Sequence, residues 1–339
     1  MEILAGEIKT NEMSENAAGG SELIARKIAQ VVPMELLKEC QIINTRVREL
    51  APDKIRVLVI HDLPGDPECD HLKNGGYKRF HLIVFVSNWQ MQQFCAHYKI
   101  PYEVCCVIKN AVVPSVRAAA PLAAVDTPVK LVYHTTPHRG LEILVPVVEA
   151  LNKDGKNVTL DVFSSFNLYG WPQRDEQYRH VFDKIDADPT MTNHGFRPND
   201  EVRALLPDYH IFSYPSIWME TSCICLMEAM SAGLVCVHPN LGALFETAAN
   251  WTRMYQWSEN STIHAKVFYD NLSSAVDSVR TGNSLLGYDE AAQKTYADFF
   301  YSWNGRQIEW TNTLEHLVSN VKDRSIQTPP AGPSFTYQT

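Results

Sequence analysis

Long apolar runs are missing from this sequence of 339 residues. No window approaches the roughly 18 consecutive apolar residues that a membrane helix requires, so we expect no membrane span. The start of the chain also lacks the charged segment and the long apolar stretch of a signal peptide. The sequence therefore predicts a cytoplasmic protein, and peripheral contact with a membrane stays open.

Clustered basic residues and zinc-type cysteine spacings are missing as well. The chain has 30 Lys and Arg against 39 Asp and Glu, and its basic residues are scattered. A nucleic-acid groove needs concentrated positive charge, so we expect no nucleic-acid partner. Cys105 and Cys106 are adjacent, and one residue separates Cys223 from Cys225. Neither spacing suits a zinc site, and we interpret all eight cysteines as reduced thiols.

The chain does contain short apolar runs that alternate with helical patterns. Several runs are almost continuously apolar, as expected for parallel strands that are covered on both faces. Alternation of strands and helices predicts an α/β fold with doubly wound sheets. The predicted strands are residues 41–47, 55–60, 82–87, 104–108, 129–134, 158–165, 192–196, 210–215 and 234–239.

An Ala- and Pro-rich stretch without a clear period, residues 116–129, divides this pattern and is typical of a linker. We therefore predict two Rossmann-like domains, 1–125 and 126–323, that face each other across a cleft. Whether the last helices pack back on the first domain stays open. Residues 324–339 have the composition of an irregular tail.

The stretch METSCICLMEAMSAGLVCVHPN places Glu220 and Glu228 eight positions apart. We expect a helix that begins near Ser222 or Cys223 and ends at Gly233. Its first amides would have no partner within the helix and would form an anion site. Eight helical residues rise about 12 Å, which is roughly the reach from a hexose through a diphosphate to a ribose. The alternative is that Glu220 caps the helix and Glu228 lies on a solvated face, although its apolar neighbours favour burial.

The longer segment PSIWMETSCICLMEAMSAGLVCVHPNLGALFE resembles the signature of retaining family 4 glycosyltransferases of the GT-B fold. Its order of Pro-Ser, Glu, seven residues and Glu-Ala-Met matches that pattern. Thr221 and Cys223 stand where the pattern has glycines, and Leu234 stands where it has proline. Gly242 and Ala243 replace a glycine pair. These departures put the shape of the sugar pocket in doubt more than the phosphate site.

Other segments resemble the same family. LVYHTTPHRGLEIL resembles the strand that ends in a phosphate-binding cation and a glycine, which places Arg139 and Gly140 there, with His134 as a weaker second base. Gly195 and Phe196 match the segment that approaches the nucleotide base.

In the first domain, Gly19 and Gly20 match the loop before the first helix, where glycine permits positive φ. His61 and Asp62 follow a buried strand, where ligands bind in α/β sheets. The resemblance implies that His61 contacts the sugar or the acceptor, and we place Asp62 on the acceptor side.

The resemblance implies a metal-independent transfer of a hexose from a UDP- or GDP-linked sugar to a saccharide hydroxyl, with retained configuration and no cofactor. Amides, the helix dipole and Arg139 would carry the charge of the leaving group. Glu220, His61 and Arg139 are the expected catalytic residues. The expected donor-binding residues are Gly19, Gly20, His134, Gly140, Ser164, Gly195, Phe196, Thr221, Ser222, Cys223, Ile224, Cys225 and Glu228.

Two alternatives and one decoy complete this interpretation. A nucleotide-sugar epimerase would share the fold and need no acceptor, whereas a silent nucleotide-sugar binder would show no turnover. Asp186 and Asp188 imitate a metal-binding D-x-D motif, but they precede Pro189 in a polar segment, and we interpret them as loop. The base, sugar, acceptor and oligomeric state stay open.

Overall fold

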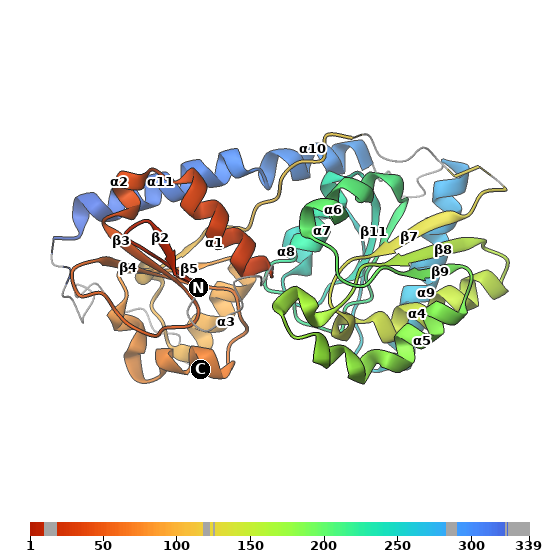
Figure 1. Cartoon of the computed structure of the whole chain (residues 1–339), viewed down its shortest axis with the longest axis horizontal. Coiled ribbons are helices and arrows are strands. Elements are labelled where there is room, and N and C mark those ends of the chain that lie inside the picture. The colour runs from red at the N-terminus through yellow and green to blue at the C-terminus, as the bar shows by residue number, and fades with distance from the viewer. Residues whose placement is uncertain (10–18, 118–122, 125, 283–289, 323, 325–339) are drawn as a thin grey trace. The chain divides into compact units, whose positions relative to one another are not determined.

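A computed structural model describes residues 1–9, 19–117, 123–124, 126–282, 290–322 and 324 of the chain. The chain forms two compact units, Met1–Ala111 with Trp303–Thr339, and Val112–Ser302. Each unit contains a six-stranded sheet (Figure 1). Residue 125 at the predicted domain boundary, residues 118–122 of the predicted linker and residues 325–339 of the predicted tail lie outside the described residues.

Hydrogen bonds tie the segment after Ala111 to the second unit. The Val112 N–H donates to the Tyr301 carbonyl at 2.9 Å, and the Ser115 N–H donates to Ser231 Oγ at 2.9 Å. The division at residue 112 therefore falls earlier than the boundary placed at 125 from composition, because composition does not register these contacts.

The sheet of the first unit has the order β2-β1-β3-β4-β5-β6. Four strands are parallel, as predicted: β3 Cys40–Asn44, β4 Ile55–Ile60, β5 Leu82–Phe85 and β6 Cys105–Val107. β3 and β4 are fully buried, whereas β6 at the edge is half-buried. Two antiparallel strands, β1 Glu2–Leu4 and β2 Glu7–Lys9, extend one edge. Sequence analysis missed this pair because each strand is only three residues long and β2 is fully exposed.

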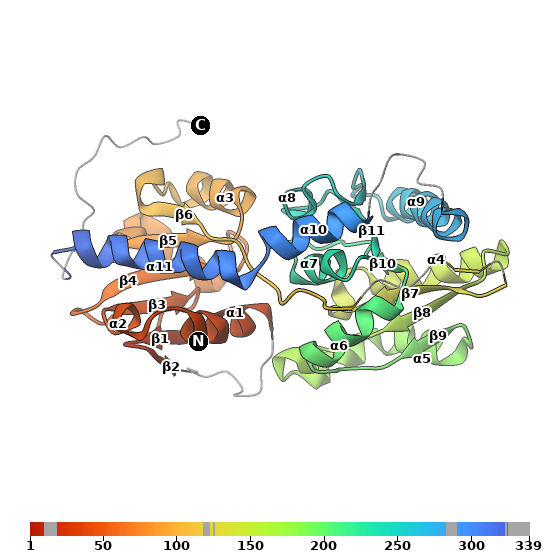
Figure 2. The same ribbon diagram turned by 90° about the horizontal axis from the view of Figure 1, so that it is seen from above.

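Helices cover this sheet: α1 Gly20–Val31, α2 Met34–Leu37, α3 Asn88–Tyr98 and α11 Trp303–Asn320, with the 3-10 segments η1 Pro67–Arg79 and η2 Tyr102–Val104. Ser87 caps α3 by accepting a hydrogen bond from the Gln90 N–H at 3.1 Å. The C-terminal helix α11 contacts α1 and α2 (Figure 2), so the first unit is built from both ends of the chain.

The sheet of the second unit is parallel throughout, in the order β12-β11-β10-β7-β8-β9. Its strands are β7 Val129–Tyr133, β8 Val158–Val162, β9 Met191–Asn193, β10 Ile211–Ser213, β11 Val235–Pro239 and β12 Arg253–Tyr255. The winding reverses between β7 and β10, which is where ligands bind in Rossmann-like sheets. Every predicted strand is present, with ends that differ by a few residues. Only the short β12 of this sheet was missed.

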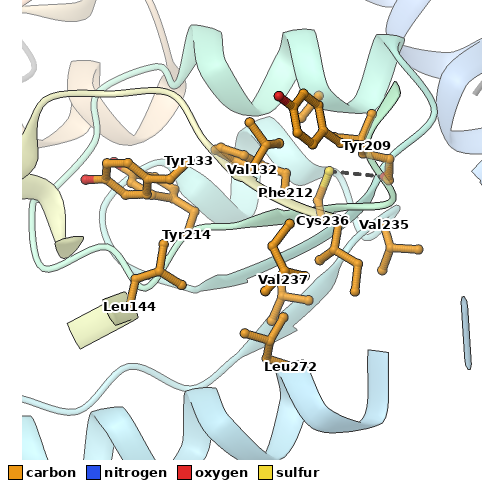
Figure 3. Close-up of a cluster of buried hydrophobic side chains, with 14 of the residues drawn as sticks. Val132, Tyr133, Leu144, Tyr209, Phe212, Tyr214, Val235, Cys236, Val237 and Leu272 are labelled. Atoms are coloured by element: carbon orange, nitrogen blue, oxygen red, sulfur yellow. Dashed lines mark hydrogen bonds between the residues drawn. The ribbon is translucent and has the colours of Figure 1, made fainter. Parts of the chain in front are cut away.

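The helices of the second unit are α4 Leu141–Lys153, α5 Arg179–Ala187, α6 Asn199–Leu205, α7 Ile224–Ser231, α8 Leu244–Ala248, α9 Ser261–Thr281 and α10 Glu290–Phe300. The 3-10 segments are η3 Pro137–Arg139, η4 Phe166–Tyr169, η5 Pro172–Tyr178 and η6 Leu206–Asp208. Helix α10 packs on α7 (Figure 2). The core lies between the helices and the strands, where Leu272 of α9 meets Val237 of β11 (Figure 3).

None of the helices in the described ranges has both the length and the apolar character needed to cross a membrane.

Candidate functional site

The candidate site lies at the carboxyl ends of β7, β8 and β10 in the second unit. Several buried polar atoms there have no hydrogen-bond partner among the described residues. They are His134 Nε2, Thr136 Oγ1, His138 Nδ1, Arg139 Nε, Ser164 Oγ, Ser213 Oγ and Glu228 Oε2. Buried polar atoms are normally paired, so their concentration at the reversal of the winding indicates a site for a polar ligand.

Glu220 is buried and paired. Its Oε1 accepts hydrogen bonds from Arg139 Nη1 and from the Tyr214 hydroxyl, and the residue is 5% exposed. The alternative in which Glu220 caps the helix is wrong, because the N-cap is Cys223. The position of Arg139 in the turn is as predicted. It ends η3 and lies one residue before Gly140, and α4 begins at Leu141.

Two glycines fix the backbone around this ion pair. Gly140 has φ +120°, and a Cβ there would lie 2.2 Å from the carbonyl oxygen of Pro215. Gly242 has φ +63°, and its Cβ would lie 2.6 Å from the carbonyl oxygen of Glu220. That carbonyl also accepts the N–H of Ala243 at 2.6 Å. The loops that carry Arg139 and Glu220 are therefore held at a separation that only glycine allows.

Helix α7 begins at Ile224, slightly later than predicted, and Gly233 follows its end with φ +79°. Only part of the stretch from Glu220 to Glu228 is helical, so the 12 Å estimate, which assumed eight helical residues, does not apply. Cys223 makes no side-chain cap hydrogen bond to the described residues. The first amides of α7, at Ile224 and Cys225, have no partner within the helix and can bind another acceptor.

Glu228 is buried on α7 at 5% exposed, so the alternative of a solvated face is wrong. Its Oε1 accepts from Asn199 Nδ2 at 2.9 Å, and Arg203 Nε lies 3.8 Å from the same oxygen. His134 Nδ1 lies 4.0 Å from Oε2. Burial raises the pKa of Glu228 from 4.5 to about 7, and the hydrogen bond from Asn199 and the charge of Arg203 oppose this shift.

His134 is a neutral neighbour of this carboxyl group. Burial lowers its pKa from 6.5 to about 3, and its ring packs on Phe212 at 4.9 Å. An imidazole with a pKa this low is a weak phosphate-binding cation, and the role of His134 as the second basic residue of the donor site stays a prediction. The His134 carbonyl accepts a hydrogen bond from Cys225 Sγ at 3.1 Å.

An aromatic group borders the ion pair. His138 stacks on Phe166 at 5.2 Å and meets Trp218 edge-on at 5.0 Å, and Arg139 lies 6.0 Å from the Trp218 ring centroid. Burial lowers the pKa of His138 to about 4, with a smaller effect from the charges of Arg139 and Arg174. The wall beside Arg139 is therefore aromatic, and the Arg174 guanidinium lies 4.6 Å from the Phe166 ring centroid.

The other predicted donor-binding residues of this unit lie in the loops around the same edge. Ser164 follows β8 and is buried, whereas Gly195 and Phe196 follow β9 and are partly exposed. Gly195 has φ +62°, and its N–H donates to Asn193 Oδ1 at 3.0 Å. Thr221 and Ser222 lie partly exposed between Glu220 and α7.

The interpretation of Asp186 and Asp188 as loop is wrong for Asp186, which lies within α5. Asp188 is the C-cap of that helix, and its Oδ1 accepts from Thr190 Oγ1 at 2.7 Å. The described residues contain no group of three or more His, Cys, Asp and Glu side chains placed to hold a metal ion.

Four predicted residues belong to the first unit. His61 follows β4, its N–H donates to Thr45 Oγ1 at 3.1 Å, and its Nε2 lies 3.3 Å from Asn44 Oδ1. Burial lowers the pKa of His61 to about 4 and raises that of Asp62.

The two glycines lie at the start of α1. Gly19 is the N-cap of α1 with φ −65°, so the positive φ that glycine permits is not used there, and Gly20 begins the helix. These four residues and the second-unit residues belong to different units, so a joint role for them stays a prediction.

Sequence analysis missed several side chains of the site. Tyr214 and Ser213 lay inside a predicted strand, where they were counted as sheet residues. Asn199 and Arg203 are one helical turn apart in the segment that was matched to the nucleotide base, but only Gly195 and Phe196 of that segment were chosen. Trp218 lay between two motif positions, and nothing local marked it as a neighbour of Arg139.

Comparison with known proteins shows what the second unit and the whole fold are similar to. Residues 130–258 match the family described as Glycosyl transferases group 1. Over 121 residues the chain is 26% identical to the putative colanic acid biosynthesis glycosyltransferase WcaL of Escherichia coli K12, a match that covers 34% of this chain and 28% of WcaL. Residues 130–258 are thus similar to a glycosyltransferase domain, and glycosyltransferases are transferase enzymes.

Solved structures match over more of the chain. A glycosyltransferase from Rickettsia africae superposes with a TM-score of 0.64 at 16% identity, covering 93% of this chain and 85% of that one. HepE of Anabaena, in complex with UDP and glucose, superposes with a TM-score of 0.58 at 14% identity, covering 90% of this chain and 85% of that one. The pneumococcal O-GlcNAc transferase GtfA, in complex with UDP and GlcNAc, superposes with a TM-score of 0.57 at 13% identity, covering 80% of this chain and 54% of that one. The fold is therefore the α/β GT-B fold with two Rossmann-like halves.

Proposed function

We propose that this protein transfers a hexose from a nucleoside-diphosphate sugar to a hydroxyl group of a glycan or glycan precursor. The proposed reaction retains the anomeric configuration and needs no metal ion or cofactor. The observation that carries this proposal is the set of unpartnered buried polar atoms at the carboxyl ends of β7, β8 and β10, beside the start of α7. A UDP-linked donor is supported by the relatives whose structures contain UDP with a sugar, or UDP-glucose.

The diphosphate is assigned to Arg139 and the first amides of α7. Arg139 Nε has no partner among the described residues, and the guanidinium can present two parallel N–H groups to phosphate oxygens. Amides at Ile224 and Cys225 add the positive end of the helix dipole. Both stabilise negative charge on the leaving group without a cation from solution.

The two carboxylates are assigned to the two ends of the donor. Glu228 would accept hydrogen bonds from the ribose hydroxyls through Oε2, the oxygen without a partner in the described chain. Glu220 would orient the transferred sugar and does not attack it. The bond from the anomeric carbon to the diphosphate breaks, and the acceptor oxygen bonds to the same face. A diphosphate oxygen takes the acceptor's proton, so charge and atoms balance.

Nucleotide binding is the first test of this proposal. Isothermal titration calorimetry with UDP, GDP, UDP-glucose and GDP-mannose should detect binding to the wild type. Glu228→Ala should weaken this binding at least about tenfold, because it removes the hydrogen-bond acceptor assigned to the ribose. Glu201→Ala is the matched control, because Glu201 is an exposed glutamate on α6. A wild type that binds none of these compounds would refute the proposal.

Turnover separates the proposal from its rivals. The epimerase would convert the donor without an acceptor, and the silent binder would bind the donor and convert nothing with a broad acceptor panel. Activity should also persist in excess EDTA, because the leaving-group charge is assigned to protein groups. Loss of activity in EDTA that Mg²⁺ or Mn²⁺ restores would contradict metal independence.

A further inference from the structure

A buried tyrosine and an arginine donate to the same oxygen of Glu220. Tyr214 follows β10, has no exposed surface, and directs its hydroxyl to Oε1, to which Arg139 Nη1 also donates. Burial, with a further effect from the charge of Glu220, raises the pKa of Tyr214 well above its ordinary value. The phenol therefore keeps its proton and serves as a hydrogen-bond donor.

The two donors differ in what else they can bind. Arg139 is partly accessible, with a side chain 20% exposed, and its Nε has no partner in the described residues. Tyr214 is enclosed in the aromatic cluster of Tyr133 and Phe212, with ring centroids 6.2 and 5.4 Å away. A ligand at the site can thus compete for the guanidinium but not for the phenol.

We propose that Tyr214 is a positioning residue that holds Glu220 in place while Arg139 turns to the diphosphate of the donor. The inference rests on the proposed function, because that function supplies the anion for Arg139. When Arg139 shares or breaks its bond to Oε1, the tyrosine keeps that buried oxygen paired. Without the tyrosine, Glu220 would either lose its partner or retain Arg139, and each outcome slows transfer.

Among the groups around Glu220, Tyr214 is the one placed to keep Oε1 paired when Arg139 turns away. The charged and titratable groups that interact with Glu220 are Arg139 of η3, Tyr133 of β7, Tyr214, and Cys223 and Cys225 at the start of α7. Arg139 is the cation of this set. Burial raises the pKa of both thiols, so neither supplies a charge at neutral pH.

The test compares Tyr214→Phe with Tyr133→Phe. Both tyrosines are fully buried in one cluster, but the Tyr133 hydroxyl donates to the Thr136 carbonyl at 2.8 Å and not to Glu220. The rate is the slow hydrolysis of UDP-glucose, UDP-N-acetylglucosamine or GDP-mannose by water, which requires no acceptor. Y214F should lower kcat by about 10- to 100-fold, the loss expected for one hydrogen bond to a charged group, and Y133F by less than about threefold.

The separation of kcat from KM distinguishes positioning from general loosening. The phenol is assigned to Glu220 and not to the donor, so Y214F should lower kcat and leave the KM for the donor within about threefold. Incorporation of 3-fluorotyrosine at position 214, which keeps the ring and makes the hydroxyl a stronger donor, should keep kcat within about threefold of the wild type. Values of kcat and KM for Y214F that match those of Y133F would overturn the proposal.

A double-mutant cycle tests the same point without turnover. Y214F and Glu220→Gln should be coupled in the urea midpoint of unfolding, and the coupling should grow in saturating UDP because Arg139 is then engaged elsewhere. Coupling that vanishes in UDP would overturn the role of Tyr214. If the wild type binds no nucleoside diphosphate, the proposed function fails, whereas normal binding with an unchanged Y214F refutes only this inference.

Discussion

Glu228→Gln should stabilise the folded protein, and the gain should increase with pH. Burial holds the pKa of Glu228 at about 7 against its usual 4.5. The folded state therefore binds more protons than the unfolded state between these values, and the carboxyl group costs stability as the pH rises. Glutamine keeps the acceptor for Asn199 Nδ2 and removes the charge.

The magnitude follows from the shift. The difference between about 7 and 4.5 corresponds to roughly 3 kcal/mol above pH 7, at about 1.4 kcal/mol per pH unit. At pH 5 the carboxyl group is largely ionised in the unfolded state and protonated in the folded state. The same linkage then gives a destabilisation of roughly 1 kcal/mol. Glu228→Gln should therefore raise the free energy of unfolding by about 1 kcal/mol at pH 5 and about 3 kcal/mol at pH 8.

Urea denaturation of the wild type and the variant at pH 5, 6, 7 and 8 measures this difference. Glu201→Gln, an exposed residue on α6, provides the matched control and should change stability by less than about 0.5 kcal/mol at every pH. A gain for Glu228→Gln that is equal at pH 5 and pH 8 would refute the reasoning, because it would mean that Glu228 is ionised at no cost in the folded state.

Three further outcomes are expected. Glu220→Ala should keep the calorimetric affinity for UDP or GDP within about threefold and lower turnover about 100-fold, and equal loss of both would show that its role is misassigned. Gly140→Ala should lower the free energy of unfolding in urea by at least about 2 kcal/mol, because its Cβ meets the Pro215 carbonyl. The control Gly155→Ala, whose Cβ has nothing within 4 Å, should lower it by about 1 kcal/mol or less. Similar losses for the two variants would contradict the close approach at Gly140. Leu272→Ala should cost about 2 to 5 kcal/mol as a core truncation, with nucleotide affinity intact in the folded protein; a cost below 1 kcal/mol would contradict its placement in the core.

Local pattern was sufficient where one segment alone sets the structure. The nearly continuous apolar run IRVLVI is strand β4 at the predicted residues, because a strand buried on both faces is mostly apolar. Its one charged residue, Arg56, is buried and donates through Nε to the Arg79 carbonyl at 2.7 Å. Arg139 and Gly140 were placed correctly in the turn after β7, because the strand end and the turn are close in sequence. Short elements such as β1 and β12 escaped because three residues carry too little periodicity.

Side-chain partnerships in the site could not be predicted in this way. The sequence determined that Glu220 and Glu228 flank a helix start at the end of a parallel strand, because a strand, a turn and a helix are local patterns. Only the tertiary structure decided that Arg139 and Tyr214 share one oxygen of Glu220, and that Asn199 and His134 surround Glu228. Those contacts depend on β10 pairing with β7 across about 80 residues of chain, and sheet register is set by packing of the whole unit.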